Sequence, residues 1–353
     1  MGNKTIKSFI QFGYISAIIL LPICNSCAQK KDDYSLKIDS LLKSTNPRIF
    51  NGVVLITQKD KVKYSNAANF AIFDKKKPFD CNTEFEIMSN SKQITAVLLL
   101  KEVEKGRVNL QSPIKKYLPN LTQTWADSVT VHQLLNHTHG IIDLSKPLAF
   151  KPGNDFKYGN LSYSLLGQII EFSTKKTYSE LANSLFKQLK MKNTYCYNKE
   201  KIQQLVSGHT NKNNVFTIVQ GTIITNESIP AGGIISTAND LTIWNKNLHH
   251  GKLLKPKTYQ LMTNYSTLSQ HDVFGKNKVG YGYGIRISDK TNPKFIGHTG
   301  LGDGFAAVNL YFPENDVSVI VLENQMNDNS AIYYYFETEI RKIIEKSSLT
   351  NKQ

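Results

Sequence analysis

A serine and a lysine one helical turn apart are the first candidates for chemistry in this 353-residue sequence. Ser89 and Lys92 lie in FEIMSNSKQITAVLLL, where a short polar step leads into a long apolar run. Residues three apart on a helix share a face, so the spacing places an amine beside a hydroxyl. A free lysine has a pKa of about 10.4 and is protonated at neutral pH, but burial among apolar side chains lowers that pKa. An uncharged Lys92 could then activate Ser89 as a nucleophile.

Helix capping is the plain alternative, because a serine at a helix start can accept from an N–H of the first turn while the lysine points to water. The spacing alone is a weak signal, since Ser-x-x-Lys occurs five times in the chain. Only the helix predicted from Ser89 to Lys105, and closed by Gly106, has apolar residues nearly all the way round. That pattern indicates burial on several sides, and the helix dipole would favour an oxyanion beside the serine.

A tyrosine and an asparagine, Tyr158 and Asn160, stand just ahead of a predicted helix in KYGNLSYSLLG. Each of the two residues has a plain structural reading. Tyr158 could belong to the core, and Asn160 could be the N-cap of the following helix.

Histidines mark two further stretches. His298, Thr299 and Gly300 lie in FIGHTGLGDGF, where a predicted strand enters a glycine-rich turn. They could form a plain turn, and no strand–turn–helix unit is present that would favour phosphate binding. His137 and His139 in LLNHTHGI could suggest a metal site, but a third ligand is not nearby in the sequence. We therefore expect neither a metal nor an organic cofactor.

Taken together and in order, these motifs resemble the serine β-lactamase and penicillin-binding-protein superfamily. The resemblance is closest to the branch that contains class C β-lactamases, D-stereospecific peptidases and related esterases. It runs from about Asn51 to the final predicted helix. The stretches that carry it are FEIMSNSKQITA, LLNHTHGI, YGNLSYSLLGQIIE, AGGIISTANDL, GYGYGI and GHTGLGDGF.

The resemblance implies a role for each residue of the first group. Ser89 would be the nucleophile that becomes acylated, and Lys92 would hold and activate it. Tyr158 would act as a base during acylation and as an acid toward the leaving group. Asn160 would hydrogen-bond both Lys92 and the amide of the substrate.

The resemblance also implies a second wall for the site. His298, Thr299 and Gly300 would line it on an edge strand, and the backbone N–H groups of Ser89 and Leu301 would bind the oxyanion. β-Lactamases and transpeptidases usually have a lysine where His298 stands, and that fixed cation binds the substrate carboxylate. Histidine is mostly neutral at pH 7. The swap is frequent in the peptidases and esterases of this branch, so strong β-lactamase activity is not expected, whereas slow acylation stays open.

Predicted strands lie at both ends of the chain, with predicted helices between them. NGVVLITQKDKVKYSNAANFAIF reads as two strands around a turn at Lys59 and Asp60, and GYGYGIRIS, GFAAVNLYF and VSVIVLENQ read as strands near the other end. The economical arrangement is an α+β fold of the β-lactamase and transpeptidase type. It has one antiparallel sheet from both chain ends, terminal helices that cover it, a helical insert at about 87–195 and a cleft between the two parts. The final helix is expected to bury Ile332, Phe336, Ile340 and Ile343.

The first residues have the layout of an export signal. Lys4 and Lys7 precede an apolar stretch, and small residues follow it. A permanent membrane anchor is the alternative, but Gln11 and Pro22 leave too little apolar length for a span of about 20 residues. We therefore expect residues 1–28 to be a signal peptide.

Two forms of processing fit the residues around the cleavage point. Cleavage could leave Gln29 as the new N-terminus, or residues 1–26 could be a lipoprotein signal with a lipid anchor on Cys27. Either form predicts export to the periplasm, to the outer membrane as a lipoprotein, or out of the cell. The hydrolase domain would then span residues 33–347.

The composition of the chain limits the kinds of binding partner that we expect. The formal net charge is +15, and the lysines are dispersed, which is typical of a solvated surface in anionic surroundings such as an envelope polymer or lipid head groups. There is no basic platform interleaved with aromatic residues and no zinc-finger spacing, so we expect no nucleic-acid partner. Cys81 and Cys196 could pair in an exported chain or remain as two buried thiols.

The sequence therefore predicts an exported serine hydrolase that acts through a Ser89 acyl-enzyme. Its substrate would be a small molecule or a peptide, with an amide or ester bond, such as a D-amino-acid peptide from the cell wall, a β-lactam-like compound or a small ester. The alternative is a muropeptide or β-lactam sensor that is acylated without turnover. A structural lipoprotein is a third reading.

Overall fold

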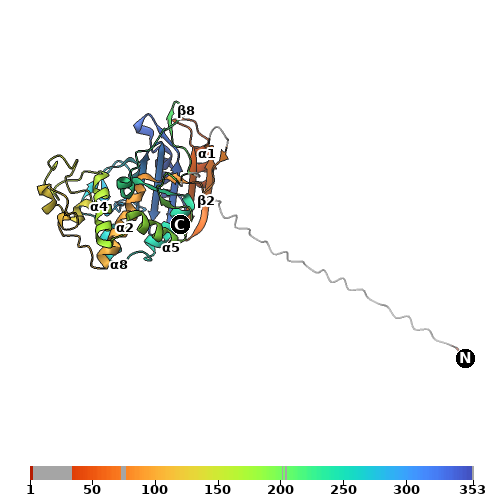
Figure 1. Ribbon diagram of the computed structural model, residues 1–353. Coiled ribbons are helices and arrows are strands. Elements are labelled where there is room, and N and C mark those ends of the chain that lie inside the picture. The colour runs from red at the N-terminus through yellow and green to blue at the C-terminus, as the bar shows by residue number, and fades with distance from the viewer. Residues whose placement is uncertain (3–33, 73–76, 201, 203–204, 352–353) are drawn as a thin grey trace. The chain divides into compact units, whose positions relative to one another are not determined.

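An eight-stranded antiparallel sheet forms the centre of the computed structural model. Its strand order is β10-β11-β12-β13-β14-β15-β1-β2, so strands from the two ends of the chain lie side by side (Figure 1, orange and blue). This confirms the predicted α+β layout with one sheet from both chain ends. The residues that the structure describes are 1–2, 34–72, 77–200, 202 and 205–351. The strands of this sheet are β1 (Gly52–Gln58), β2 (Lys61–Ala68), β10 (Leu268–Ser269), β11 (Val279–Tyr281), β12 (Arg286–Ser288), β13 (Phe295–Gly302), β14 (Phe305–Phe312) and β15 (Val317–Glu323).

The first hairpin forms where the sequence predicts it. Lys59 and Asp60 both have positive φ, 48° and 63°, which is the turn geometry that matches the twist of two antiparallel strands. Side chains then alternate across the sheet. Val53 packs into one hydrophobic cluster and Val54 into another, so the sheet is buried on both faces.

One face is covered by the first and last helices, α1 and α9. Phe336, Ile340 and Ile344 of α9 recur every four residues and are buried on this face. The prediction for this helix was partly wrong. The α-helix begins at Tyr335, Ile332 lies in a preceding 3₁₀ turn, and Ile344 is buried in place of Ile343, which is only half-buried.

The other face carries the remaining helices, and the structure has three further small sheets. Figure 1 shows α2 and α4 near each other among these helices, and α7 packs on β1 and β15. The small sheets are β5 (Phe85–Glu86), β9 (Ile234–Ser236) and β6 (Tyr195–Cys196); β16 (Gln325–Asn327), β7 (His209–Lys212) and β8 (Val215–Ile218); and β3 (Phe70–Ile72) with β4 (Lys77–Pro78). The helices are α1 (Tyr34–Leu42), α2 (Ser91–Glu104), α3 (Val131–Leu135), α4 (Leu161–Thr174), α5 (Tyr178–Leu189), α6 (Ile229–Gly232), α7 (Ala238–His249), α8 (Pro256–Thr263) and α9 (Tyr335–Glu345).

The stretch GYGYGIRIS is not one strand but two, β11 and β12, joined by a tight turn. Gly284 in this turn has φ +67°, and a Cβ built on it would lie 2.6 Å from the Lys92 carbonyl oxygen. The chain therefore reverses where only glycine fits against the backbone of α2. Because glycine and aromatic residues alternate on both sides of the turn, the pattern reads as one continuous strand.

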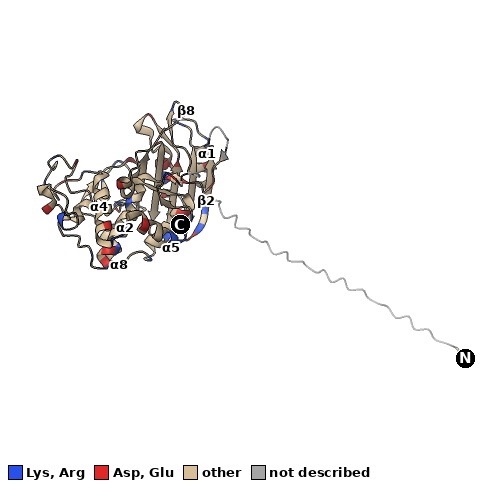
Figure 2. Cartoon of the chain, viewed as in Figure 1, with Lys and Arg blue, Asp and Glu red and all other residues tan. Residues whose placement is uncertain are grey.

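The predicted signal peptide, residues 1–28, lies outside the described residues except for Met1 and Gly2, which belong to a separate unit from residues 33–353. In the described part of the chain, no helix combines the length and hydropathy that a membrane span requires. Cys81 and Cys196 are separate free thiols rather than a disulfide. Lys and Arg are spread over many elements rather than gathered in one patch in the view of Figure 2.

Candidate active site

Ser89 lies in a 3₁₀ turn, Met88–Asn90, that leads into α2. The expected helix therefore starts two residues later than predicted, at Ser91. Met88 has φ +48°, a left-handed conformation that is unfavourable for a side chain of this size. Such strain persists only where the surroundings hold it, and it is common at functional sites. The turn leaves the Ser89 hydroxyl half-buried and in contact with Lys92.

The amine of Lys92 is completely buried and has three oxygen neighbours. Its Nζ lies 3.0 Å from Ser89 Oγ, 2.8 Å from Asn160 Oδ1 and 2.7 Å from the Ala231 carbonyl oxygen. Burial lowers the pKa of Lys92, although Tyr158 opposes the shift. In the neutral amine, two N–H groups donate to the amide and carbonyl oxygens, and the lone pair remains for the hydroxyl proton of Ser89.

Asn160 is not a side-chain cap of α4, since it has α-helical backbone angles and makes no capping hydrogen bond. Its Oδ1 instead accepts from Lys92. The contact joins residues 68 positions apart in the sequence, and it agrees with the position that the family resemblance implies. The capping interpretation of Asn160 is therefore wrong.

Tyr158 stands over the same amine, with its ring centroid 5.0 Å from Lys92 Nζ. His137 supports the ring from behind, with the two ring centroids 4.6 Å apart. Burial, and then the charge of Lys92, place the pKa of His137 well below its ordinary value, so this imidazole is neutral. Sequence analysis assigned no role to His137, and its position suggests that it orients the phenol.

The two histidines of LLNHTHGI do not form a metal cluster in the described structure. His137 Nδ1 lies 3.1 Å from Ser162 Oγ, and His139 Nδ1 accepts from the backbone N–H of Ile141. Among the described residues, no group of three His, Cys, Asp or Glu side chains is placed to hold a metal ion. Both side chains instead help to fix the loop next to Tyr158.

His298 is buried, and its partners define its tautomer. Its Nδ1 lies 2.7 Å from the Thr299 carbonyl oxygen, which can only accept, so Nδ1 carries the proton. Its Nε2 therefore accepts from Arg286 and Tyr281, at 3.2 Å and 3.0 Å. Burial, and then Arg286, place the pKa of His298 well below its usual range. A neutral imidazole thus stands where the family usually has a fixed cation.

Arg286 is the residue that the sequence analysis missed. Its guanidinium is buried and lies 5.4 Å from the Tyr158 ring centroid and 5.3 Å from that of Tyr281. The permanent positive charge beside His298 therefore comes from the neighbouring strand, β12. A signal was present in the sequence, because Arg286 is a charge between Ile285 and Ile287 in a strand-like run.

The strand β13 is only partly an edge strand. It pairs with β12 at residues 295–297, while residues 298–302 have no strand partner on that side among the described residues. The prediction of an edge is thus wrong for the first half and correct for the second. Gly300 brings this open half against the nucleophile turn, because a Cβ on it would lie 2.2 Å from the Ile87 carbonyl oxygen. Leu301, the predicted oxyanion donor, is the next residue.

Thr299 is buried, and its hydroxyl is already engaged. Its Oγ1 lies 2.9 Å from His271 Nε2, and His271 Nδ1 accepts from the backbone N–H of Val273. The imidazole N–H of His271 therefore donates to Thr299.

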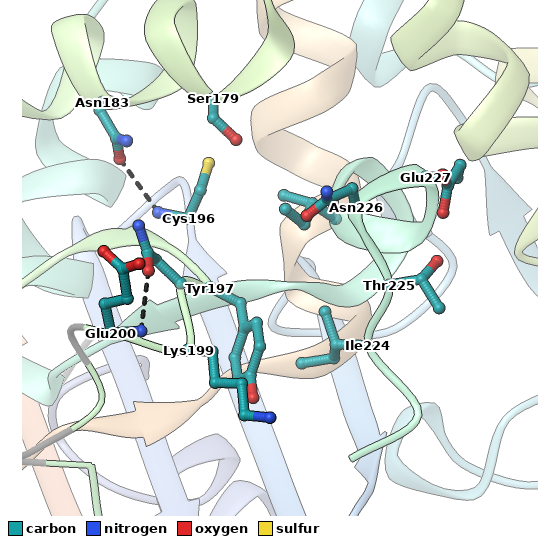
Figure 3. A pocket seen from close by; sticks show the side chains of 12 residues that line it. Ser179, Asn183, Cys196, Tyr197, Lys199, Glu200, Ile224, Thr225, Asn226 and Glu227 are labelled. Atoms are coloured by element: carbon teal, nitrogen blue, oxygen red, sulfur yellow. Dashed lines mark hydrogen bonds between the residues drawn. The ribbon is translucent and has the colours of Figure 1, made fainter.

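Three cavities in the described part of the chain are lined by residues other than Ser89, Lys92 and Tyr158, and one of them is drawn in Figure 3.

Comparisons with known proteins agree with this arrangement. Protein flp from Staphylococcus aureus (strain MRSA252) is 25% identical over 323 residues, which cover 83% of this chain and 63% of that protein, so the chain spans less than two thirds of this relative. Penicillin-binding protein 4* from Bacillus subtilis (strain 168) is 23% identical over 319 residues, 79% of this chain and 69% of that protein.

A solved structure gives the same fold. The D-amino acid amidase from Ochrobactrum anthropi SV3, complexed with D-phenylalanine, superposes with a TM-score of 0.76 at 21% identity, over 89% of this chain and 99% of that chain. The family described as Beta-lactamase matches residues 38–336, which is most of the sequence. This chain belongs to the β-lactamase family, within the superfamily of serine hydrolases and penicillin-binding proteins.

Proposed function

We propose that the protein is an exported serine hydrolase that cleaves an amide or ester bond through an acyl-enzyme on Ser89. The observation that carries the proposal is the fully buried Lys92 amine, 3.0 Å from Ser89 Oγ, with its other two neighbours being oxygens that can only accept. A neutral amine in this position is a base aimed at one hydroxyl. The same burial that makes the ammonium unfavourable therefore prepares the nucleophile.

In the proposed reaction, Ser89 Oγ attacks the substrate carbonyl and its proton passes to Lys92. The negative charge that develops on the carbonyl oxygen is stabilised by the backbone N–H groups of Ser89 and Leu301. Tyr158 relays the proton to the leaving group, which departs as an amine or alcohol. Water then attacks the acyl-enzyme, Ser89 regains its proton, and the carboxylic acid is released.

The substrate class follows from the charges around Tyr158. Arg286 pairs with no carboxylate among the described residues, and its charge lies on the side where the leaving group takes its proton. A leaving group that carries a carboxylate, as in a D-amino-acid peptide, suits this arrangement. The names of two similar proteins, a penicillin-binding protein and a D-amino acid amidase, support small amide or cell-wall substrates for this chain as well.

Export is proposed from the sequence pattern of residues 1–28 alone, with the mature protein in the periplasm, on the outer membrane through a lipid at Cys27, or secreted. Fractionation of the expressing cell, followed by mass spectrometry of the mature N-terminus, tests this. A peptide beginning at Gln29 indicates cleavage, a lipid on Cys27 indicates a lipoprotein, and an intact cytoplasmic chain rejects export.

The hydrolase proposal is tested by intact-mass spectrometry and turnover with a panel of β-lactams, D-Ala-D-Ala peptides and p-nitrophenyl esters. We expect multiple turnover of at least one compound, a mass adduct that maps to Ser89, and loss of both in Ser89→Ala. A stable adduct without turnover would instead identify a sensor. Absence of any adduct on Ser89 from the whole panel would reject the proposal.

A further inference from the structure

A cavity of about 580 Å³ lies next to the candidate site and plays no part in the reaction proposed above. It combines two acidic side chains, Glu86 and Asp303, with apolar walls. Tyr197, Lys199 and Ile224 line both this cavity and the neighbouring one drawn in Figure 3. The apolar residues of the wall are Ile202, Leu205, Val206, Val219, Ile224 and Phe305.

Glu86 is an unusual acid for this position. It is only 4% exposed, and its Oε2 has no hydrogen-bond partner among the described residues. Burial, and then the charge of Asp303, raise the pKa of Glu86 to about 8. A buried polar group without a partner is unfavourable and rare, and it calls for an explanation such as a bound ion or ligand.

Asp303 is fixed in the turn between β13 and β14. Its Oδ2 accepts from Thr222 Oγ1 at 2.7 Å and from the backbone N–H of Ile223 at 2.9 Å. No ion pair joins Glu86 or Asp303 to a Lys, Arg or His in the described part of the chain. The one basic residue among the described lining residues, Lys199, is exposed. Among the residues that the structure describes, the two acids of the cavity therefore have no ion-pair partner.

Both acids belong to the segments that build the candidate site. Glu86 precedes Ser89 by three residues, so their Cα atoms are at most about 11 Å apart. Asp303 follows Leu301 by two residues, and a Cβ on the intervening Gly302 would lie 3.1 Å from Met88 Sδ. A substituent of a few methylene groups can span such a distance.

The direction in which a substrate would enter the cavity follows from the open half of β13. Tyr158 lies close to His298, at one end of residues 298–302, with ring centroids 6.1 Å apart. The leaving group, which takes its proton from Tyr158, belongs at that end. The acyl part of the substrate must then extend in the opposite direction, toward Asp303 and the cavity.

We propose that this cavity binds the ammonium group of a substrate whose acyl part carries a primary amine on an aliphatic chain, an inference that rests on the proposed Ser89 chemistry. An ammonium has three N–H donors. The Asp303 carboxylate, the Tyr197 hydroxyl and Glu86, which releases its proton to water when the cation binds, can accept them, while the apolar walls cover the methylene stem. A metal ion fits less well, because the described residues contain no cluster of three ligating side chains.

Kinetics with a matched pair of esters test the inference. p-Nitrophenyl 6-aminohexanoate and p-nitrophenyl hexanoate differ only by an amine that is five methylene groups from the carbonyl. We expect wild-type kcat/KM to be about 10- to 100-fold higher for the amine, as charge-assisted hydrogen bonds would give. Glu86→Gln and Asp303→Asn should each bring the ratio close to one. Glu227→Gln, an exposed acid of the neighbouring cavity, is the matched control and should leave the ratio unchanged.

A binding measurement separates this inference from the hydrolase proposal. Calorimetric titration of Ser89→Ala with 6-aminohexanamide and with hexanamide needs no turnover, and we expect at least tenfold tighter binding of the amine, lost when Glu86→Gln is added. If neither ester is hydrolysed but this selectivity is found, the hydrolase proposal fails and the ammonium site stands. Turnover of both esters without preference, or a calcium ion that binds through Glu86 while the amine does not, overturns the inference.

Discussion

Lys92 and Arg48 are both buried basic side chains, but their surroundings differ in one respect. Arg48 forms a bidentate ion pair with Glu323, at 2.7 Å and 2.8 Å, and also donates to two backbone carbonyls. Lys92 has three oxygen neighbours, and none of them belongs to a carboxylate in the part of the chain that the structure describes. Burial alone would lower the pKa of both side chains. The charge of Glu323 nevertheless raises the pKa of Arg48, whereas the pKa of Lys92 is lowered. The partner, rather than the depth of burial, decides whether a cation holds the fold together or becomes a base.

Of the substitutions that test this comparison, the one at Lys92 should have the largest effect, and the effect should be on catalysis. Lys92→Met should lower kcat/KM on a p-nitrophenyl ester by about 10³- to 10⁴-fold, which corresponds to about 4–5.5 kcal/mol, because the general base is removed. Stability should fall by only about 1 kcal/mol, because the apolar side chain removes the cost of burying an amine but leaves the Ala231 carbonyl oxygen without its Lys92 donor. Thermal denaturation of the same preparation supplies the control. Retained activity would show that Lys92 is not the base.

Arg48→Met should have the opposite profile. It leaves Glu323 and Glu337 buried side by side without their cation, so the free energy of unfolding should fall by about 3–5 kcal/mol. The kcat/KM of the folded fraction should stay near the wild-type value, because Arg48 touches none of the candidate site residues. Urea denaturation followed by circular dichroism measures the loss. A stable Arg48→Met protein would show that the ion pair contributes little.

Glu86 is the acidic counterpart of Lys92, since it is a buried acid that forms no ion pair with any described residue. Its pKa is raised to about 8, so the native state favours the protonated acid. That stabilisation is complete below the unfolded pKa of about 4.3 and is lost as the pH rises through 8. Glu86→Gln should therefore match the wild type near pH 4 and be more stable by about 1–3 kcal/mol at pH 9. Parallel stability curves across this range would contradict the assignment.

The smallest effect concerns the pH dependence of activity. Arg286 contributes to the lowered pKa of Lys92, after burial and against the influence of Tyr158. Removing this charge in Arg286→Gln should raise the pKa of Lys92, so the acidic limb of the kcat/KM profile should move to higher pH. Arg107→Gln, an arginine of a surface ion pair, is the matched control. If the acidic limb of the kcat/KM profile does not move in Arg286→Gln, the group that titrates in this limb is not Lys92.

The fold was predictable to the extent that its signals are local. The turn at Lys59 and Asp60, the buried helix after Ser89 and the strands at both chain ends each leave a periodic pattern in a short stretch. The β11–β12 hairpin was not predictable in this way, because the residues on either side of Gly284 alternate as they would in a single strand. The contact that determines the turn is with α2, which is distant in the sequence.

In the candidate site, too, features with a local sequence signal could be predicted, whereas contacts between distant segments could not. Ser89 and Lys92 share a local spacing, and the sequence resemblance placed Asn160 beside them. The Ala231 carbonyl that completes the surroundings of Lys92 could not be found from side-chain types, because any residue has such an oxygen. Arg286 reaches His298 only because β12 and β13 are neighbours in the sheet. Sequence patterns indicated the chemical groups, whereas the pairing of strands determined their charge environment.

The close fit of Gly284 against the Lys92 carbonyl sets a tolerance for the whole molecule. Replacing Gly284 by alanine would change none of the candidate site residues. The added methyl group would, however, push the hairpin and α2 apart. The hairpin carries Tyr281 and Arg286, so such a displacement would move both side chains relative to Lys92 and α2. The hairpin thus sets the distance between the Arg286 charge and Lys92, and a mutation in a strand connection would change the candidate site without altering any of its side chains.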